Sequence, residues 1–211
     1  MSLEDALEHY KRYFNEKIET HGPVPQGVDY NGPDAQFLRF EQLVKVIDPD
    51  QPFDLIDFGC GYGGLLSFLQ EKGWEFTYHG YDMLEKMILA AREAHGLASN
   101  ADFTASETDL ATSDYVIAGA IFNNKFEAPV EKWREQTLRV LQKLNGLCTR
   151  GLAFNMLSNY SDADRMSMRP DLYFADPLFY FDYCKRNFSR EVALLHDYGL
   201  YDFTILVRKQ V

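Results

Sequence analysis

Two amphipathic patterns open the chain. The first predicts a helix over residues 3–19, because apolar side chains recur at spacings of three and four: Leu3, Leu7, Tyr10, Phe14 and Ile18. A link rich in proline and glycine follows at residues 22–27. The second pattern predicts a helix capped by Asp34, with an apolar face made of Phe37, Phe40, Leu43, Val44 and Ile47. Residues 1–48 are therefore expected to form an N-terminal helical cap.

Apolar runs and helical patterns then alternate. The runs predict strands at 53–58, 77–82, 103–105, 114–122 and 151–157, and helices fall between them at 63–72, 84–95 and 130–145. The run from Asp114 to Phe122 is almost continuously apolar, as in strands buried on both faces of a parallel sheet. Such alternation favours a doubly wound α/β sheet.

The end of the chain breaks this rhythm. Residues 191–195 and 203–207 read as two strands separated only by a turn near Gly199. So short a link requires an antiparallel hairpin, because parallel strands need a long crossover. We therefore expect one α/β domain spanning residues 1–211: a doubly wound, mostly parallel seven-stranded sheet with a C-terminal antiparallel hairpin strand.

A connection of about twenty residues, far longer than the usual two to six, precedes the last helix. We expect residues 155–177 to form an inserted lid or substrate loop, with a polar and aromatic set made of Asn155, Tyr160, Asp162, Asp164, Arg165, Arg169 and Tyr173. In the alternative interpretation, residues 161–164 cap a short helix. Asp176 precedes a proline and is expected to cap the next helix.

A glycine-rich turn follows the first strand. Asp57 precedes Gly59, Gly61 and Gly63 at alternate positions, and a helix begins directly afterwards. Glycines let the backbone approach a ligand, and the helix N-terminus offers unpaired N–H groups. Gly59, Gly61 and Gly64 also match the dinucleotide pattern, so the glycines alone do not choose a ligand. A carboxylate at Asp57 repels a pyrophosphate and attracts a sulfonium or ammonium group.

A second acid completes the pattern. Asp82 ends the second strand and lies 82 − 59 = 23 positions after Gly59. Nucleotide-binding α/β units place the carboxylate that accepts the ribose hydroxyls at about this distance.

These residues resemble the class I S-adenosylmethionine (SAM)-dependent methyltransferases. Asp57, Gly59, Gly61 and Gly63 match the D-x-G-x-G-x-G motif of that family, and Asp82 matches its ribose acid. The resemblance covers roughly residues 50–211. The hairpin at residues 196–204 also looks like segments of bacterial small-molecule methyltransferases. The resemblance implies SAM as the cofactor, and it implies the same fold as the strand pattern.

Further cofactor contacts are expected at the carboxyl ends of the other strands, where open α/β sheets bind their ligands. Ser106 and Glu107 are expected at the adenine edge, and Ala118 and Gly119 beside the methionine portion. Three more residues are expected to contact the cofactor. Cys60 and Met83 lie next to the motif positions, and Arg39, on the N-terminal cap, is expected to pair with the methionine carboxylate. Each of three residues also has a structural alternative: Ser106 as a turn residue, Gly119 as a packing residue, and Arg39 as an exposed arginine on the helix surface.

A catalytic base is not evident from the sequence. His196 and Tyr160 are the two catalytic candidates, and His196 is also explained by a structural role. The five histidines are scattered without metal-ligand spacing, so no metal site is expected.

Composition narrows the partners. The net charge is −11 with a pI near 4.9, which disfavours nucleic-acid binding and favours neutral or cationic small substrates over strongly acidic ones. No stretch reaches the roughly 20 apolar residues of a membrane span. The acidic N-terminus lacks a secretory core, and three separated cysteines suggest reduced thiols, so we expect a cytoplasmic protein. The oligomeric state, monomer or homodimer, is left open.

The primary hypothesis is a SAM-dependent methyltransferase that transfers a methyl group to an O or N atom of a small molecule by in-line displacement. One alternative is an NAD(P)-dependent oxidoreductase, although Tyr10, Tyr13 and Tyr160 each lack the lysine four residues on that a proton relay uses. The other alternative is a non-catalytic module that binds SAM.

Overall fold

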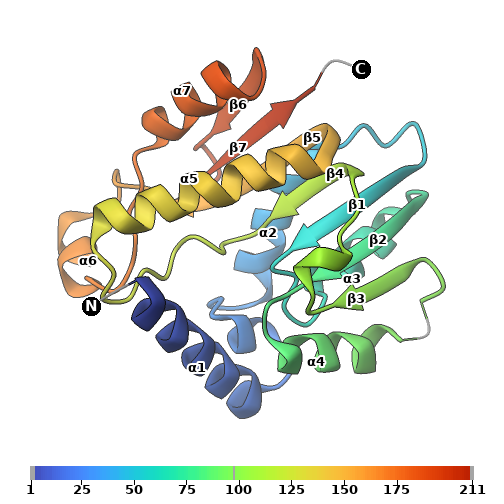
Figure 1. The fold of residues 1–211 in the computed structure, drawn as a ribbon, viewed down its shortest axis with the longest axis horizontal. Helices are drawn as coiled ribbons and strands as arrows, with labels where there is room; N and C mark the ends of the chain where they lie inside the picture. The colour runs from blue at the N-terminus through green and yellow to red at the C-terminus, as the bar shows by residue number, and fades with distance from the viewer. Residues whose placement is uncertain (1–2, 97, 210–211) are drawn as a thin grey trace.

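A seven-stranded sheet forms the centre of the computed structural model, which describes residues 3–96 and 98–209 (Figure 1). The strand order is β3-β2-β1-β4-β5-β7-β6, and β7 runs antiparallel to both of its neighbours while the other pairs are parallel. The strands are β1 (Phe53–Phe58), β2 (Phe76–Tyr81), β3 (Ala101–Thr104), β4 (Ser113–Ala118), β5 (Cys148–Leu157), β6 (Glu191–Leu195) and β7 (Asp202–Arg208). The predicted fold class is confirmed.

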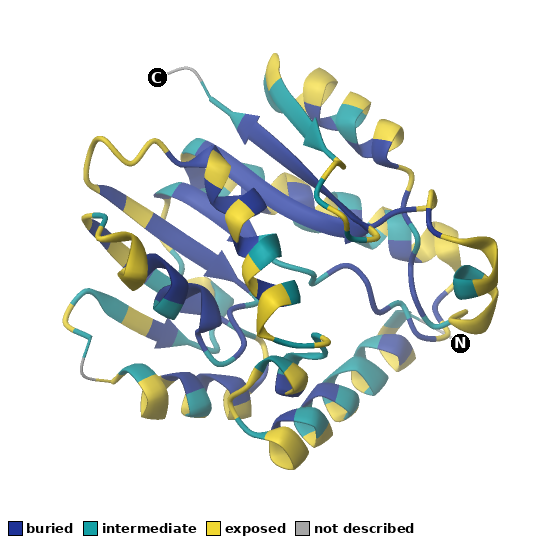
Figure 2. Cartoon of the chain, turned by 180° about the vertical axis from the view of Figure 1, so that it is seen from behind, coloured by how far each residue is buried: buried dark blue, intermediate teal, exposed yellow. Residues whose placement is uncertain are grey.

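Helices cover both faces of this sheet. Apolar side chains of α5 (Val130–Leu147) and α7 (Pro177–Asn187) pack on one face. Those of α2 (Pro33–Leu43), α3 (Gly64–Lys72) and α4 (Glu85–His95) pack on the other. Figure 2 shows the central strands buried between helices whose outer sides are exposed. Burial on both faces explains why the strands read as continuous apolar runs.

The first helix, α1 (Leu3–His21), lies beside α4, and Ala6 near its beginning joins the core on the α5 side of the sheet (Figure 1). It confirms the helix expected over residues 3–19. It buries Phe14 and Ile18 against Leu84 and Met87, and the 3-10 turn η1 (Pro25–Val28) packs against it. Helix α2 begins at Pro33 with Gly32 as its N-cap, so the predicted cap by Asp34 is wrong. The 3-10 turn η2 (Val44–Val46) continues from α2.

Two predicted strand boundaries are wrong. Strand β4 ends at Ala118 and not at Phe122, because the backbone turns at Ala120 with a left-handed φ of 59°. Phe122 lies in the loop after β4, where it is only 3% exposed. An apolar residue at this position therefore reflects burial in the loop and not a continuing strand. Strand β5 begins three residues before position 151.

The long connection after β5 begins later than predicted, because Asn155 still belongs to that strand. It contains the short helix α6 (Ala163–Met168), as the alternative interpretation expected, and an isolated bridge between Ser158 and Ala175 ties its two ends together. Asp176 caps α7 by accepting hydrogen bonds from the backbone N–H groups of Leu178 and Phe179. That predicted cap is confirmed, whereas a lid role for the connection stays a prediction.

Candidate active site

Two adjoining cavities lie at the carboxyl ends of β1, β2 and β4. Four residues line both: Tyr10, Gly59, Asp82 and Ile121. The first, here called the α5 lobe, is mostly apolar and is completed by Leu7, Phe58, Tyr81, Met83, Phe122, Trp133, Gln136, Thr137 and Val140. The second, the glycine lobe, is completed by Phe14, Val28, Tyr30, Gln36, Phe40, Asp57, Cys60, Gly61, Leu84, Met87, Ile117, Gly119 and Ala120.

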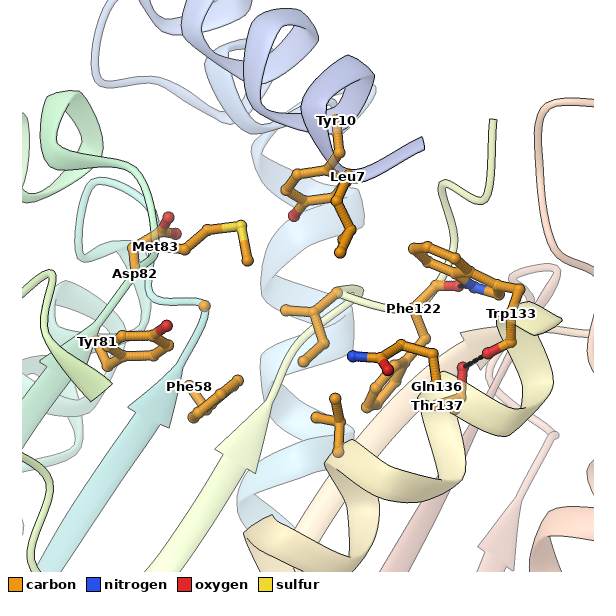
Figure 3. Close-up of a pocket in the computed structure, with 13 residues that line it drawn as sticks. Leu7, Tyr10, Phe58, Tyr81, Asp82, Met83, Phe122, Trp133, Gln136 and Thr137 are labelled. Atoms are coloured by element: carbon orange, nitrogen blue, oxygen red, sulfur yellow. Dashed lines mark hydrogen bonds between the residues drawn. The ribbon is translucent and has the colours of Figure 1, made fainter. Parts of the chain in front are cut away.

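Side chains from three elements converge on the α5 lobe. Figure 3 shows Leu7 and Tyr10 reaching in from α1, Gln136 and Thr137 from α5, and Met83 from the end of β2. The indole N–H of Trp133 donates to the backbone oxygen of Phe122 at 2.8 Å, which fixes the loop after β4 against α5. This lobe therefore suits a flat, largely apolar group.

The glycine turn brings its backbone to the wall of both lobes. Gly59 has a φ of 86°, and a Cβ there would lie 2.3 Å from Cγ2 of Ile121. Gly61 has a φ of 54°, and its Cβ would lie 2.7 Å from Cγ1 of Val28. A larger residue at either position meets both backbone strain and a side chain that lines a lobe.

Gly63 has a different role. It is the left-handed N-cap of α3, its absent Cβ faces the ring of His95 at 2.8 Å, and it lines neither lobe. This glycine lets the turn enter the helix, and its expected cofactor contact stays a prediction.

Asp57 lies at the bottom of the glycine lobe with 5% of its surface exposed. Its Oδ2 accepts a hydrogen bond of 2.5 Å from the hydroxyl of Tyr78 on the neighbouring strand. Burial raises the pKa of Asp57 to about 7, the hydrogen bond from Tyr78 opposes that rise, and the nearby charge of Asp82 adds to it. The carboxyl group is thus ready to ionise beside a cationic ligand.

Asp82 stands where the two lobes meet. Its carboxylate accepts the backbone N–H groups of Gly61 and Leu84, each at 3.0 Å, and so joins the glycine turn to the end of β2. Burial raises the pKa of Asp82 to about 6 although both hydrogen bonds lower it. The position fits the ribose role expected from its spacing.

Three further candidates line the lobes. Cys60 and Gly119 face the glycine lobe, and Met83, 43% exposed, faces the α5 lobe. Burial raises the pKa of the Cys60 thiol well above its usual value, so this cysteine is not an activated nucleophile. Ala118 is fully buried and lines neither lobe, and its expected backbone contact with the methionine portion stays a prediction.

Arg39 is engaged within the protein. Its Nε and Nη2 donate to both carboxylate oxygens of Asp202, at 3.0 and 2.5 Å, and its Nη1 donates to the backbone oxygen of Ala35. The structure pairs this guanidinium with Asp202, and its pairing with a methionine carboxylate stays a prediction. Asp202 is fully buried and also accepts from the amide of Asn155, so the guanidinium balances an internal charge.

Ser106 and Glu107 lie outside both lobes. The hydroxyl of Ser106 is hydrogen-bonded to that of Thr108 at 2.8 Å in the turn η3 (Glu107–Asp109), and Glu107 pairs with Lys143 of α5. The turn role left open for Ser106 is the one the geometry supports. Contact of either residue with adenine stays a prediction.

His196 and Tyr160 also lie away from the cavities. Both are exposed, with their ring centroids 5.9 Å apart, and neither lines a lobe. Their position does not add support for a catalytic role, which stays a prediction for both residues. Among the described residues, no group of three or more acidic, histidine or cysteine side chains is placed to hold a metal ion.

A third cavity, the α6 lobe, opens from the glycine lobe. It shares Phe14, Val28, Tyr30 and Ala120 with the glycine lobe. The rest of its wall is mainly polar: Asp29, Asn31, Arg39, Asn123, Asn124, Leu157, Arg165, Arg169 and Leu172. Sequence reasoning placed Arg165 and Arg169 in a substrate loop, but it missed Asn123 and Asn124, for which no motif gave a signal.

Comparison with known proteins decides the family. No protein-family model matches the chain. A protein of Mycobacterium tuberculosis (strain ATCC 25618 / H37Rv) named "Putative methyltransferase Rv1506c" is 43% identical over 166 residues, which cover 79% of this chain and 99% of the relative. The chain belongs to the methyltransferase family. The family assignment therefore favours a methyltransferase over the alternative of an NAD(P)-dependent oxidoreductase.

Solved methyltransferases share the fold of this methyltransferase. The N-methyltransferase NodS of Bradyrhizobium japonicum, in complex with S-adenosylhomocysteine, matches with a TM-score of 0.64 at 11% identity over 94% of this chain and 97% of its own. Human N-acetylserotonin methyltransferase, in complex with SAM, matches with a TM-score of 0.60 at 14% identity over 99% of this chain and 66% of its own. The chain spans only 40% of WbdD and 57% of an O-methyltransferase family protein of Burkholderia thailandensis. These likenesses show the class I methyltransferase fold.

Within the described residues, no helix has the length and apolar character that crossing a membrane would need.

Proposed function

We propose that this methyltransferase binds SAM across the two lobes that meet at Asp82 and transfers its methyl group to an O or N atom of a small molecule. The position of Asp82 carries the proposal, because its carboxylate separates an apolar lobe from a polar one and is the only acidic side chain, among the described residues, that lines both. SAM is divided in a similar way: it has a largely apolar adenine at one end, a charged methionine portion at the other, and a ribose between them.

Each portion has a matching surface. We assign adenine to the α5 lobe, where Phe58, Tyr81 and Met83 offer apolar contacts. The ribose hydroxyls are assigned to Asp82, and the methionine portion to the glycine lobe above Asp57. An approaching sulfonium or ammonium group would lower the pKa of Asp57 from about 7 and ionise it.

The protein's part in the reaction is alignment and exclusion of water. SAM supplies a methyl group on a positively charged sulfur, which is already a good leaving group. Tyr10 and Phe14 of α1 cover the glycine lobe, and Tyr30 stands where this lobe opens into the α6 lobe. An acceptor held in the α6 lobe would approach from that opening, in line with the bond to be broken. We assign no catalytic base.

Small-molecule acceptors are favoured because the α6 lobe is a bounded cavity and the net charge of −11 opposes nucleic-acid binding. A cytoplasmic location is proposed on the thiol pattern alone, since Cys60, Cys148 and Cys184 are free and buried.

Isothermal titration calorimetry with SAM, S-adenosylhomocysteine, NADH and NADPH tests the cofactor. We expect binding of the first two only. Selective binding of a dinucleotide, or of none of the four, would refute the proposal. Transfer of radioactive methyl from SAM to a small-molecule mixture then distinguishes an enzyme from a SAM-binding module, since the module binds without transfer.

A further inference from the structure

The charges around the α6 lobe are balanced except at one residue. Three ion pairs neutralise the other charged side chains at the lobe: Lys17–Asp29 at 2.8 Å, Arg39–Asp202 at 2.5 Å and Arg169–Asp171 at 2.7 Å. Arg165, on α6, lines the same cavity and forms no ion pair with any residue in the described part of the chain. One positive charge is therefore left over.

Arg165 is held in place although it is unpaired. Its guanidinium carbon lies 4.5 Å from the ring centroid of Tyr201, and the hydroxyl of Tyr201 is anchored by a hydrogen bond to Asp162. The Nε–H of Arg165 is buried, and nothing in residues 3–96 and 98–209 accepts its hydrogen bond. A buried donor without an acceptor is costly, so the guanidinium is not satisfied within the protein and has hydrogen-bonding capacity left for a ligand in the lobe that it lines.

Two amides of the same wall also offer donors. Asn124 is 6% exposed, and its side chain makes no hydrogen bond within the described residues. Asn123 uses its Oδ1 to accept the backbone N–H of Leu157 at 3.0 Å, which leaves its NH2 group for the cavity. The carboxylates at the lobe, in contrast, are already engaged by the ion pairs. The lobe thus presents a positive charge and amide donors, while its carboxylates are already paired.

We propose that the α6 lobe recognises an oxyanion on the methyl acceptor, with Arg165 as the charged partner and Asn123 and Asn124 as additional donors. The inference rests on the proposed function, and it names the substrate class: a small molecule that carries a carboxylate or phosphate group in addition to the atom to be methylated. The expectation of neutral or cationic substrates came from the overall net charge, whereas binding depends on the local field of the lobe.

Ligand-observed NMR titrations test this without turnover. The probes are small hydroxy and amino acids, each with its primary amide, and small phosphate monoesters, each with its parent alcohol, titrated in the presence of saturating S-adenosylhomocysteine. We expect at least one anion to bind about 10-fold or more tightly than its neutral partner, the typical effect of a charge-assisted hydrogen bond. The pair that shows the preference tells a carboxylate from a phosphate.

Arg165→Gln should remove the preference and weaken anion binding about 10-fold, with S-adenosylhomocysteine affinity and melting temperature retained. Arg186→Gln, an exposed arginine on α7, is the matched control and should change neither. No anion-selective binder, or a preference that survives Arg165→Gln, would overturn the inference. Failure of S-adenosylhomocysteine to bind would instead count against the proposed cofactor, because the titrations can be repeated without it.

Discussion

The hydroxyl of Tyr78 donates a hydrogen bond of 2.5 Å to the carboxyl group of Asp57 inside the sheet. The two side chains come from neighbouring parallel strands, Tyr78 is fully buried, and Asp57 is 5% exposed. Burial nevertheless raises the pKa of Asp57 to about 7, so the acid beneath the glycine turn changes its charge near neutral pH. The stability of the protein and its affinity for a cationic ligand should therefore both depend on pH.

Stability without cofactor should fall as the pH rises from about 4 to about 7. The folded pKa of Asp57 lies above its unfolded value, so its contribution is complete below the unfolded pKa and is lost as the pH passes the folded one. The slope is at most about 1.4 kcal/mol per pH unit for one group. Asp82, with a pKa of about 6, acts in the same direction.

Urea unfolding at pH 5 and pH 7.5 checks this expectation. Asp57→Asn keeps an acceptor for Tyr78 and carries no charge, so the variant should lose part of the pH dependence and be more stable than the parent at pH 7.5. An unchanged slope would show that Asp57 titrates in the folded protein as it does in the unfolded chain.

Affinity for SAM should rise with pH through about 7, because a sulfonium or ammonium group binds the ionised form of Asp57 better. In Tyr78→Phe the carboxylate loses its hydrogen bond, its pKa rises, and the midpoint of this dependence should move to higher pH. Calorimetry at pH values between 6 and 9 gives the two midpoints. Identical midpoints would separate Asp57 from the charged portion of the ligand.

Asp82→Ala should weaken SAM binding about 100-fold or more, because both ribose hydroxyls and the N–H groups of Gly61 and Leu84 lose an ionised acceptor. The control is Asp102→Asn on the adjacent strand β3, where the side chain is 63% exposed and is paired with His79. Binding should be unchanged in the control. SAM bound by the Asp82→Ala variant as tightly as by the parent would refute the ribose assignment.

Gly59→Ala should abolish SAM binding and lower the melting temperature, because the new methyl group lies 2.3 Å from Ile121 at a φ of 86°. Gly146→Ala is a control in α5, where an added Cβ meets nothing within 4 Å. That change should stabilise the protein by about 0.5–1 kcal/mol, since alanine has the higher helix propensity. Calorimetry and thermal melting of both variants make the comparison.

Arg39→Leu should lower the free energy of unfolding by about 3–5 kcal/mol, because it leaves the fully buried Asp202 without its charged partner. The same change at the exposed Arg186, which pairs with Asp182, should have little effect. Equal effects at both positions would mean that the buried ion pair contributes no more to stability than the exposed one.

The glycine turn shows how far local sequence reaches. Asp57, Gly59, Gly61 and Asp82 were found from their spacing alone, because a strand, a tight turn and a second strand fix where these few residues meet. Gly63 satisfied the same motif but faces His95, since the chain has already turned into α3 there. A motif identifies the turn, and the packing around the turn decides which of its residues face the ligand.

Arg39 shows where local reasoning ends. Its side chain suits a carboxylate, and it binds one, but the carboxylate belongs to Asp202, which lies 163 positions away in the chain. No helical or strand periodicity reports such a contact. The cavity walls also contain Trp133, Asn123 and Asn124. These residues reach the walls because α5 and the loop after β4 pack there, which no local pattern reports.

The sequence by itself determined the sheet, its antiparallel ending and the acid–glycine turn, because these depend on hydrophobic periodicity, backbone freedom and short connections. Only the tertiary structure decided which polar side chains remain without partners at the cavity walls. Arg39 and Arg165 look alike in the sequence, yet one is neutralised by a buried aspartate and the other faces the α6 lobe unpaired. The reason is that an ion pair depends on distance in space, which the folded chain sets between residues far apart in sequence.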